Sequence, residues 1–225
     1  MTRKPALAVQ IGLTVAVVVC AVAVVLYFVS SGTEGKTQGA REAKGIRVAS
    51  SALITREGGS EPKVVLSMYE DFLCPYCRAF EQQFGPMVDQ LIDSGAVAAD
   101  YYMVAILDRP QNQNYSSRAG GAAYCAAADS TEVFRRFHAA LFAQQPSETG
   151  DTFPTDTQLA EVARQAGASP DALACITSGR YADQVKDLAK VTGVHATPTV
   201  RINGQDYDVS TPEALASKIN VLLGR

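Results

Sequence analysis

The stretch Asp71-Phe-Leu-Cys74-Pro-Tyr-Cys77-Arg-Ala-Phe80 contains two cysteines separated by two residues. The apolar run Val64-Val65-Leu66 precedes it, and apolar residues follow it at helical spacing, namely Phe80, Phe84, Met87, Val88, Leu91 and Ile92. This pattern predicts that the cysteine pair lies where a buried strand passes into an amphipathic helix. A helix N-terminus stabilises a thiolate through its free N–H groups and its dipole. We therefore expect a reactive Cys74 at the start of the helix, Pro75 in its first turn, and a more shielded Cys77 close enough to bridge Cys74.

The composition of the chain narrows the classes of function. The 225 residues and a net charge of -3 suit one ordinary domain with additional segments and give no argument for nucleic-acid binding. The chain has two histidines, His138 and His195, which argues against a histidine-based metal site. Cys20 lies in an apolar run near the N-terminus, and the other four cysteines form an even set in the body of the chain. An even set is what extracytoplasmic disulfides would give.

Residues 6–29 form an apolar run without any charged residue. The run is long enough to span a bilayer, which takes about 20 residues. We therefore predict a short N-terminal tail at residues 1–5, a single-pass transmembrane anchor at 6–29, a flexible tether at 30–46 and a domain at 47–225. The alternative is a signal peptide cleaved near Ser30-Ser31-Gly32. Positive charges flank both ends of the run and do not decide its orientation, so the domain is placed outside the membrane on the grounds of its chemistry and its second cysteine pair.

The remaining sequence predicts an α/β frame interrupted by helices. Strands are expected at residues 47–55, 63–69, 96–107, 199–202 and 207–209. Helices are expected at 74–93, bent at Gly85-Pro86, and at 211–223. Between the third and fourth strands, helical patterns occupy 116–128, 131–144, 156–166, 170–178 and 181–191. We interpret this segment as a helical insertion at about residues 112–191.

The order strand, Cys-x-x-Cys, helix, strand, helical insertion, then Gly193-Val-His-Ala-Thr197-Pro198-Thr199 before a hairpin resembles the thioredoxin fold. In particular, the chain is similar to the DsbA-like thiol-disulfide oxidoreductases, which carry a helical domain at that point. The closest local similarity is in residues 70–78 and 193–204, and the resemblance covers roughly residues 48–225. The implied fold class is α/β, a thioredoxin fold with an inserted helical domain, here preceded by a transmembrane helix.

The resemblance implies roles for particular residues. Cys74 would be the attacking cysteine, Cys77 the resolving cysteine, and Pro198 a cis-proline that faces them. A cis bond before Pro198 would expose the backbone of Thr197 to a substrate peptide. No organic cofactor and no metal is expected. The implied partners are reduced secreted proteins and a membrane enzyme of the DsbB or vitamin K epoxide reductase type that reoxidises the pair, and we expect a monomer.

Two departures from the family pattern affect the chemistry. Thioredoxin-like proteins often hold a buried acid six residues before the first cysteine, where this chain has Met68. Glu70 is a nearer candidate for proton transfer, although Glu70 and Asp71 could instead cap the helix. The dipeptide between the cysteines is Pro-Tyr, as in glutaredoxins, so the redox direction is less determined than the fold. Tyr76 is expected to be exposed and to contact substrate.

Other polar and sulfur-containing residues allow two interpretations each. His195 lies three residues before Pro198 and is a candidate for tuning the Cys74 thiolate. His138 neighbours Phe134 and Leu141 on a predicted helix, where a packing role is favoured. Cys125 and Cys175 lie in the helical insertion, where we predict a structural disulfide rather than two free thiols.

These observations predict a membrane-anchored, extracytoplasmic thiol-disulfide oxidoreductase of the bacterial cell envelope that introduces disulfides into secreted or membrane proteins. A disulfide reductase or isomerase on the same fold is the first alternative. A metal-binding chaperone that uses Cys74 and Cys77 as soft ligands is an alternative of a different class, but the four methionines form no cluster near the pair. Half of a zinc site and a purely structural disulfide are the remaining, less favoured interpretations of the pair, since the sequence has no second Cys-x-x-Cys and no histidine pair to complete a zinc site.

Overall fold

The computed structural model describes residues 44–225, which form one compact unit. The predicted tail, the anchor at 6–29 and nearly all of the tether at 30–46 lie outside the described residues. Within the described range, none of the helices combines the length and the apolar character needed to cross a membrane.

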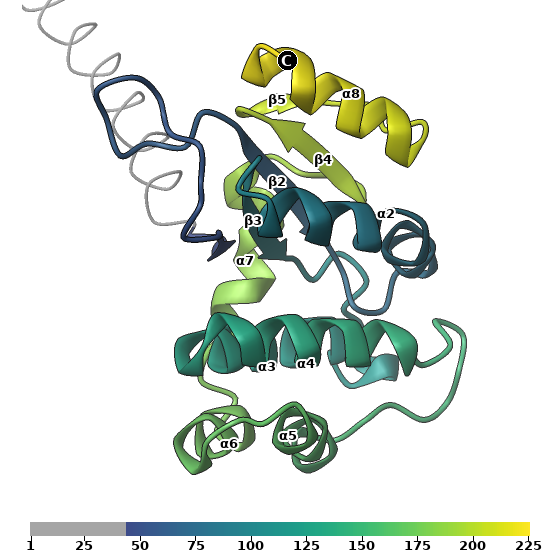
Figure 1. Cartoon of the computed structure of the whole chain (residues 1–225). Coiled ribbons are helices and arrows are strands. Elements are labelled where there is room, and N and C mark those ends of the chain that lie inside the picture. The colour runs from purple at the N-terminus through teal and green to yellow at the C-terminus, as the bar shows by residue number, and fades with distance from the viewer. Residues whose placement is uncertain (1–43) are drawn as a thin grey trace, which may run out of the picture. The chain divides into compact units, whose positions relative to one another are not determined.

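A five-stranded mixed sheet in the order β1-β3-β2-β4-β5 organises this unit (Figure 1). Its strands are β1 Ile46–Val48, β2 Val65–Glu70, β3 Ala98–Met103, β4 Thr199–Ile202 and β5 Gln205–Asp206. Strand β2 runs parallel to β3 and antiparallel to β4, and β1 and β5 pair antiparallel at the two edges. From Leu66 to Glu70 every residue of the central strand β2 is buried, as its apolar run predicts.

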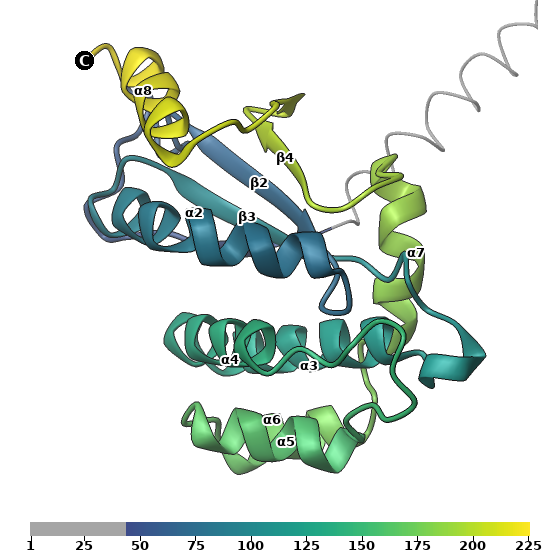
Figure 2. The same ribbon diagram turned by 90° about the vertical axis from the view of Figure 1, so that its right-hand side faces the viewer.

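Helices α2 (Pro75–Asp93) and α8 (Pro212–Leu223) pack beside one another next to the sheet (Figures 1 and 2). Helix α2 follows β2 directly and buries six residues along one side, namely Cys77, Phe80, Phe84, Val88, Leu91 and Ile92. Pro86 lies inside α2, which continues through it. Helix α8 is capped by the Thr211 hydroxyl, which accepts a hydrogen bond from the Ala214 N–H.

The helical insertion forms a second lobe between β3 and β4 (Figure 2). It contains the 3₁₀ turn η1 (Pro110–Asn112) and helices α3 (Tyr115–Asp129), α4 (Thr131–Ala143), α5 (Asp156–Gln165), α6 (Pro170–Thr177) and α7 (Ala182–Thr192). Helices α3 and α4 form the layer nearer to the sheet, and α5 and α6 pack on their outer side (Figure 1). Each predicted helix is present, with ends within one residue of the prediction.

Three strand predictions were wrong in extent. Strand β3 covers Ala98–Met103 and not residues 96–107, because its partner β2 ends at Glu70, which pairs with Met103. Strand β1 ends at Val48 because the chain turns at Ser50, whose carbonyl accepts the Leu53 N–H, whereas the prediction continued to residue 55. The last hairpin strand is Gln205–Asp206 and not residues 207–209. The two-residue turn at Asn203-Gly204 pairs Ile202 with Gln205 immediately, so the partner strand starts earlier than its apolar pattern suggests.

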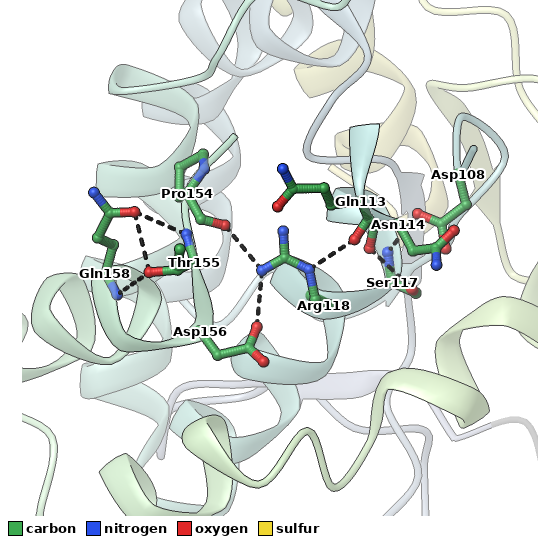
Figure 3. A network of polar contacts seen from close by, with 9 residues as sticks. All are labelled: Asp108, Gln113, Asn114, Ser117, Arg118, Pro154, Thr155, Asp156 and Gln158. Carbon is green, nitrogen blue, oxygen red and sulfur yellow. Dashed lines mark hydrogen bonds and ion pairs between the residues drawn. The ribbon is translucent and has the colours of Figure 1, made fainter. Parts of the chain in front are cut away.

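The Arg118 side chain ties two loops to the start of α3 (Figure 3). Its Nη1 donates to the Pro154 carbonyl at 2.9 Å and to Asp156 at 2.8 Å, and its Nε donates to the Gln113 carbonyl at 2.9 Å. Beside it, the Ser117 N–H donates to Asp108 at 3.0 Å. These contacts fix the segment that leaves β3 and the long connection before α5 against one helix.

A disulfide joins Cys125 on α3 to Cys175 on α6, with a Cα–Cα distance of 5.8 Å. The bridge closes a sequence separation of 50 residues within the helical lobe. The predicted pairing is therefore present, and Cys74 and Cys77 are the free cysteines of the described range.

Candidate active site

Cys74 occupies the N-cap position of α2, and Pro75 begins the helix as predicted. The sequence folds this way because β2 ends at Glu70 and a short turn, closed by the Cys74 N–H and the Asp71 carbonyl at 2.9 Å, leads into the helix. Cys74 is 5% exposed and Cys77 is fully buried, while Tyr76 between them is 74% exposed. The cysteine pair therefore lies at the surface only at Cys74, with Tyr76 projecting beside it.

The two thiols have very different acidities. The hydrogen bond from Cys77 is the largest of the contacts that lower the pKa of Cys74 to about 6, and the Thr197 hydroxyl and the N–H groups of Cys77 and Tyr76 add to it, against the opposing effect of burial. Burial raises the pKa of Cys77, and the hydrogen bond and charge of Cys74 raise it further. At neutral pH Cys74 is therefore a thiolate and Cys77 a thiol that donates to it.

The Thr197–Pro198 peptide bond is cis, and the loop that carries it faces Cys74. The Cys74 Sγ lies 3.4 Å from the Thr197 carbonyl oxygen. Strand β4 begins at Thr199, and its pairing with Tyr69 on β2 brings this loop beside the end of the strand that leads to Cys74. The structure thus brings together the four residues that the resemblance singles out, namely Cys74, Cys77, Thr197 and Pro198.

Asp71 supports the turn before Cys74 and does not cap helix α2. Its two carboxylate oxygens accept the Leu73 N–H and the Leu107 N–H, both at 2.9 Å. Its own N–H points to the Cys77 Sγ at 3.5 Å. Burial raises the pKa of Asp71 to about 6 against the hydrogen bonds that it accepts. The capping interpretation was wrong, because the N-cap position of α2 has no side-chain acceptor.

Glu70 is fully buried and lies in a cluster with His138 on α4 and Glu81 on α2. Its Oε2 is 2.9 Å from the His138 Nε2, and the His138 Nδ1 is 3.8 Å from the Glu81 Oε2. His138 also packs against the rings of Phe72, Tyr101, Phe134 and Phe142, which confirms its predicted packing role. Ligand atoms of the three residues lie within 4.8 Å of one another, a spacing that could hold a metal ion.

The sequence did not predict the partners of Glu70. Glu81 follows Cys77 by four residues on the same helix, a spacing that could have indicated a shared face. His138 is 68 residues from Glu70, and no local pattern connects them.

Gln145, just after α4, is a second residue that the sequence did not indicate. Its side-chain Nε2 donates to the Phe72 carbonyl at 3.1 Å and to the Cys74 carbonyl at 2.9 Å. The helical lobe therefore contacts the cysteine turn through one amide group.

His195 is exposed and makes no hydrogen bond or ion pair with any residue of the described range. It is not among the groups, given above, that set the pKa of Cys74. Its tuning role stays a prediction.

Comparison with known proteins agrees with the fold and the cysteine site described above. A family model described as thioredoxin matches residues 55–220. The reduced disulfide bond oxidoreductase DsbG of Mycobacterium tuberculosis is 56% identical over 80% of this chain and 88% of that chain, with a TM-score of 0.79. Reduced DsbA of the same organism is 55% identical over 81% of this chain and 93% of that chain, also with a TM-score of 0.79.

Two further matches are more limited. The thiol-disulfide oxidoreductase MdbA of Corynebacterium diphtheriae is 21% identical over 79% of this chain and 90% of that chain, with a TM-score of 0.65. The serine/threonine-protein kinase PknE of M. tuberculosis is 32% identical over 126 residues, which are 54% of this chain and 22% of the kinase. The chain thus spans about a fifth of the length of that curated relative.

The family match covers most of the chain, and the structures at more than half identity share the fold over nearly their whole length. The chain therefore belongs to the thioredoxin family, and residues 44–225 form a protein thiol-disulfide oxidoreductase of the DsbA-like type.

Proposed function

We propose that this protein introduces disulfide bonds into reduced secreted or membrane proteins on the outer side of the bacterial cytoplasmic membrane. The observation that carries the proposal is the contrast between the cysteines, with the pKa of Cys74 lowered to about 6 and that of Cys77 raised. Such a pair exchanges disulfides with a substrate through one accessible sulfur, while the other sulfur stays shielded from the substrate.

The reaction begins with the oxidised Cys74–Cys77 pair. A substrate thiolate attacks the Cys74 sulfur, the Cys74–Cys77 bond breaks, and Cys77 leaves as a thiolate that takes up a proton. A second substrate thiolate then attacks the substrate sulfur of the mixed disulfide and releases the Cys74 thiolate. The substrate has lost two electrons to form one disulfide, and the cysteine pair has gained them.

The stabilised Cys74 thiolate favours this direction. Each contact that stabilises the thiolate stabilises the reduced protein relative to the oxidised one, and this makes the disulfide a stronger oxidant. The hydrogen bond from the buried Cys77 thiol is the largest of these contacts.

A substrate chain has a place to bind beside Cys74. The partly exposed Thr197 and Pro198 border the Cys74 sulfur, and the carbonyl oxygen of Thr197 is 3.4 Å from it. An extended peptide can add to this backbone as a short strand, which makes recognition depend on main-chain hydrogen bonds and little on substrate sequence. The exposed Tyr76 ring offers an apolar contact on the helix side.

Two further parts of the proposal rest on the sequence. The uncharged run at residues 6–29 would anchor the domain to the membrane, and the tether at 30–46 would let it reach its partners. A quinone-linked membrane enzyme of the DsbB or vitamin K epoxide reductase type would reoxidise the pair, since each turnover leaves it reduced.

The reduction potential of the Cys74–Cys77 pair tests the proposal. The detergent-solubilised chain is equilibrated with glutathione buffers, and the Cys74→Ser/Cys77→Ser variant, which keeps the Cys125–Cys175 bridge, is the control. A potential near the roughly −120 mV of DsbA supports a dithiol oxidase, and one near the roughly −270 mV of thioredoxin makes the protein a reductase.

A potential near the roughly −180 mV of protein disulfide isomerase calls for a second assay, which compares a reduced with a scrambled substrate protein. Activity on the scrambled substrate alone identifies an isomerase and overturns the proposal. Activity on the reduced substrate supports it.

A further inference from the structure

Three titratable side chains from three elements meet in the interior, where α4 of the helical lobe packs on α2. Glu70 ends β2, Glu81 lies on α2 and His138 lies on α4. The Glu70 Oε2 is 2.9 Å from the His138 Nε2, and the His138 Nδ1 is 3.8 Å from the Glu81 Oε2. One oxygen or nitrogen atom of each residue lies within 4.8 Å of those of the other two. We call these residues the Glu70–His138–Glu81 cluster.

The cluster has two carboxyl groups and no cationic side chain bound to them. Among residues 44–225, no lysine or arginine forms an ion pair with Glu70 or Glu81. Arg135, about one turn before His138 on α4, is bound to two aspartates of α2 instead, at 2.8 Å each. The side chains of Glu70 and His138 are 0% and 5% exposed, so water screens their charges little. The cluster therefore lacks a positive charge.

The Glu70 carboxyl has one oxygen without a partner. Its Oε2 faces His138, whereas no donor among the residues that the structure describes reaches its Oε1. The Glu81 carboxyl lies beside it, and burial raises the pKa of both groups, that of Glu70 to about 8. A buried acceptor without a donor is unfavourable, and two adjacent buried carboxyl groups require a proton or a cation between them. Both features point to a cation as the missing partner.

The donor set of the cluster suits a transition-metal ion. An imidazole nitrogen and carboxylate oxygens are ligands of Zn²⁺, at bond lengths of about 2.0–2.2 Å. Two atoms bound at that length to one ion are about 3–3.5 Å apart, which the Glu70 and His138 atoms already match at 2.9 Å. The Glu81 carboxyl has to approach by about 1 Å. Ca²⁺ and Mg²⁺ prefer oxygen ligands throughout, so the imidazole argues against them.

The surroundings of the cluster match those of metal sites in proteins. The His138 ring is held in place by four aromatic side chains, namely Phe72, Tyr101, Phe134 and Phe142. Such an apolar shell orients a ligand and excludes competing solvent. The side chain of Glu81 is 16% exposed, which gives an ion a path to the cluster. Three protein ligands leave a four-coordinate ion one further position, which water fills from this side.

We propose that Glu70, Glu81 and His138 bind a divalent transition-metal ion, Zn²⁺ in preference to Ca²⁺ or Mg²⁺, which joins β2, α2 and the helical lobe. The site goes beyond the exchange reaction, since it uses neither Cys74 nor Cys77. The sequence argued against a metal site because histidines are scarce, but this site needs one histidine and two carboxylates. The bound ion cross-links three elements and so stabilises the packing of the helical lobe on the thioredoxin frame.

Zinc titration of the full-length, detergent-solubilised chain tests the proposal. The protein carries Cys20→Ser and is oxidised, so that the Cys74–Cys77 and Cys125–Cys175 pairs are disulfides and no thiol competes for the ion. Isothermal titration calorimetry should show one Zn²⁺ bound per chain. An excess of Ca²⁺ should not displace it, because a hard cation binds imidazole poorly.

Ligand variants locate the ion. Glu81→Gln and His138→Phe each remove one ligand and should weaken Zn²⁺ binding at least about 100-fold, since even residues that only orient a metal ligand contribute about 10–100-fold. Glu148→Gln and His195→Phe make the same changes at exposed positions and are the matched controls. The controls should keep the wild-type affinity within about twofold.

The unfolding equilibrium shows whether the ion binds the folded protein. Zn²⁺ at about 100 times its dissociation constant should shift the wild-type equilibrium about 100-fold toward the folded form, and that of Glu81→Gln only about twofold. Circular dichroism before Zn²⁺ is added separates loss of a ligand from loss of structure. Glu81→Gln changes the most exposed of the three side chains, so it carries the test if His138→Phe does not fold.

The outcomes keep the metal site and the exchange function apart. Absence of Zn²⁺ binding to the oxidised chain overturns the metal site, and so does equal binding by the wild-type protein and folded Glu81→Gln. Either result leaves the exchange function intact, because the reduction potential of the Cys74–Cys77 pair is measured separately. A potential typical of a reductase overturns the proposed function and leaves the metal site standing.

Discussion

At the scale of single residues, the chemistry depends on how differently two identical side chains are placed. Cys74 sits at a helix N-cap, where the Cys77 thiol, the Thr197 hydroxyl and two backbone N–H groups lower its pKa to about 6. Cys77 is only three residues later, yet burial removes it from these stabilising groups and from water, and raises its pKa. The asymmetry makes one sulfur the nucleophile and the other its hydrogen-bond donor.

The pH dependence of Cys74 alkylation tests this asymmetry. In the reduced protein, the rate of reaction with iodoacetamide should be about a tenth of its maximum one pH unit below the Cys74 pKa of about 6, and should level off above neutral pH. A midpoint near the ordinary thiol value of 9.0 would contradict the described hydrogen bonds. Cys77→Ser should move the midpoint upward, because the shorter C–O bond of serine holds its hydroxyl farther from the Cys74 sulfur and weakens the hydrogen bond that the Cys77 thiol donates.

The same shift has a consequence for stability. The folded-state pKa of Cys74, about 6, lies below the ordinary value of 9.0, so its thiolate contributes stability to the reduced form that is present above pH 9 and lost as the pH falls through about 6. The oxidised form has no such group, so the advantage of the reduced form should grow with pH in that window.

At the scale of elements, the helical lobe reaches the cysteine turn through Gln145. The amide donates to the carbonyls of Phe72 and Cys74 and so fixes the backbone on either side of Leu73. The Cys74 carbonyl also accepts the Cys77 and Arg78 N–H groups, which begin helix α2. Gln145 is therefore a positioning residue for the Cys74 sulfur.

Replacing Gln145 by alanine tests that role. The change should lower the free energy of unfolding by about 1–2 kcal/mol, for two hydrogen bonds to partly buried carbonyls, and should raise the pKa of Cys74 as the turn loosens. The pKa is measured from the thiolate absorbance during a pH titration. Gln144→Ala, at the exposed neighbouring position, is the control and should change neither quantity. An unchanged Cys74 pKa in Gln145→Ala would show that the contact is only structural.

At the scale of the whole molecule, side chains join the helical lobe to the thioredoxin frame at several points. Arg135 on α4 binds Asp89 and Asp93 on α2, and His138 binds Glu70 on β2. Within the lobe, the Cys125–Cys175 disulfide holds α6 to α3, and Arg118 holds the connections before α3 and α5 (Figure 3). The lobe is therefore braced internally and contacts the frame through polar groups near the active site.

Removal of the Cys125–Cys175 bridge should destabilise the lobe without altering the cysteine pair. The double variant Cys125→Ala/Cys175→Ala should lose about 4 kcal/mol of unfolding free energy, the value that the chain-entropy model gives for a loop of this length. Denaturant unfolding of the wild-type and variant proteins measures the loss. The rate at which the reduced Cys74 thiolate attacks Ellman's reagent, an aromatic disulfide, should stay at its wild-type value, since the bridge lies on α3 and α6, away from Cys74.

The sequence by itself determined the frame and the cysteine chemistry, because both depend on local patterns. Apolar periodicity placed β2, α2 and the five helices of the insertion, and the segment around Pro198 identified the loop that faces Cys74. The disulfide was also anticipated, since Cys125 and Cys175 are the remaining cysteines of the domain.

Only the tertiary structure decided which distant side chains share the space beneath the pair. Glu70, Glu81 and His138 meet because β2, α2 and α4 pack together, and Gln145 reaches Cys74 across 71 residues of sequence. Local sequence spacing does not predict either set of contacts. Hydrogen bonds between separate elements depend on how those elements pack, and not on the order of residues within one element. The same reason explains the three strand errors. Turns and strand pairing set the ends of β1 and β3 and the start of β5, where side-chain patterns predicted other residues.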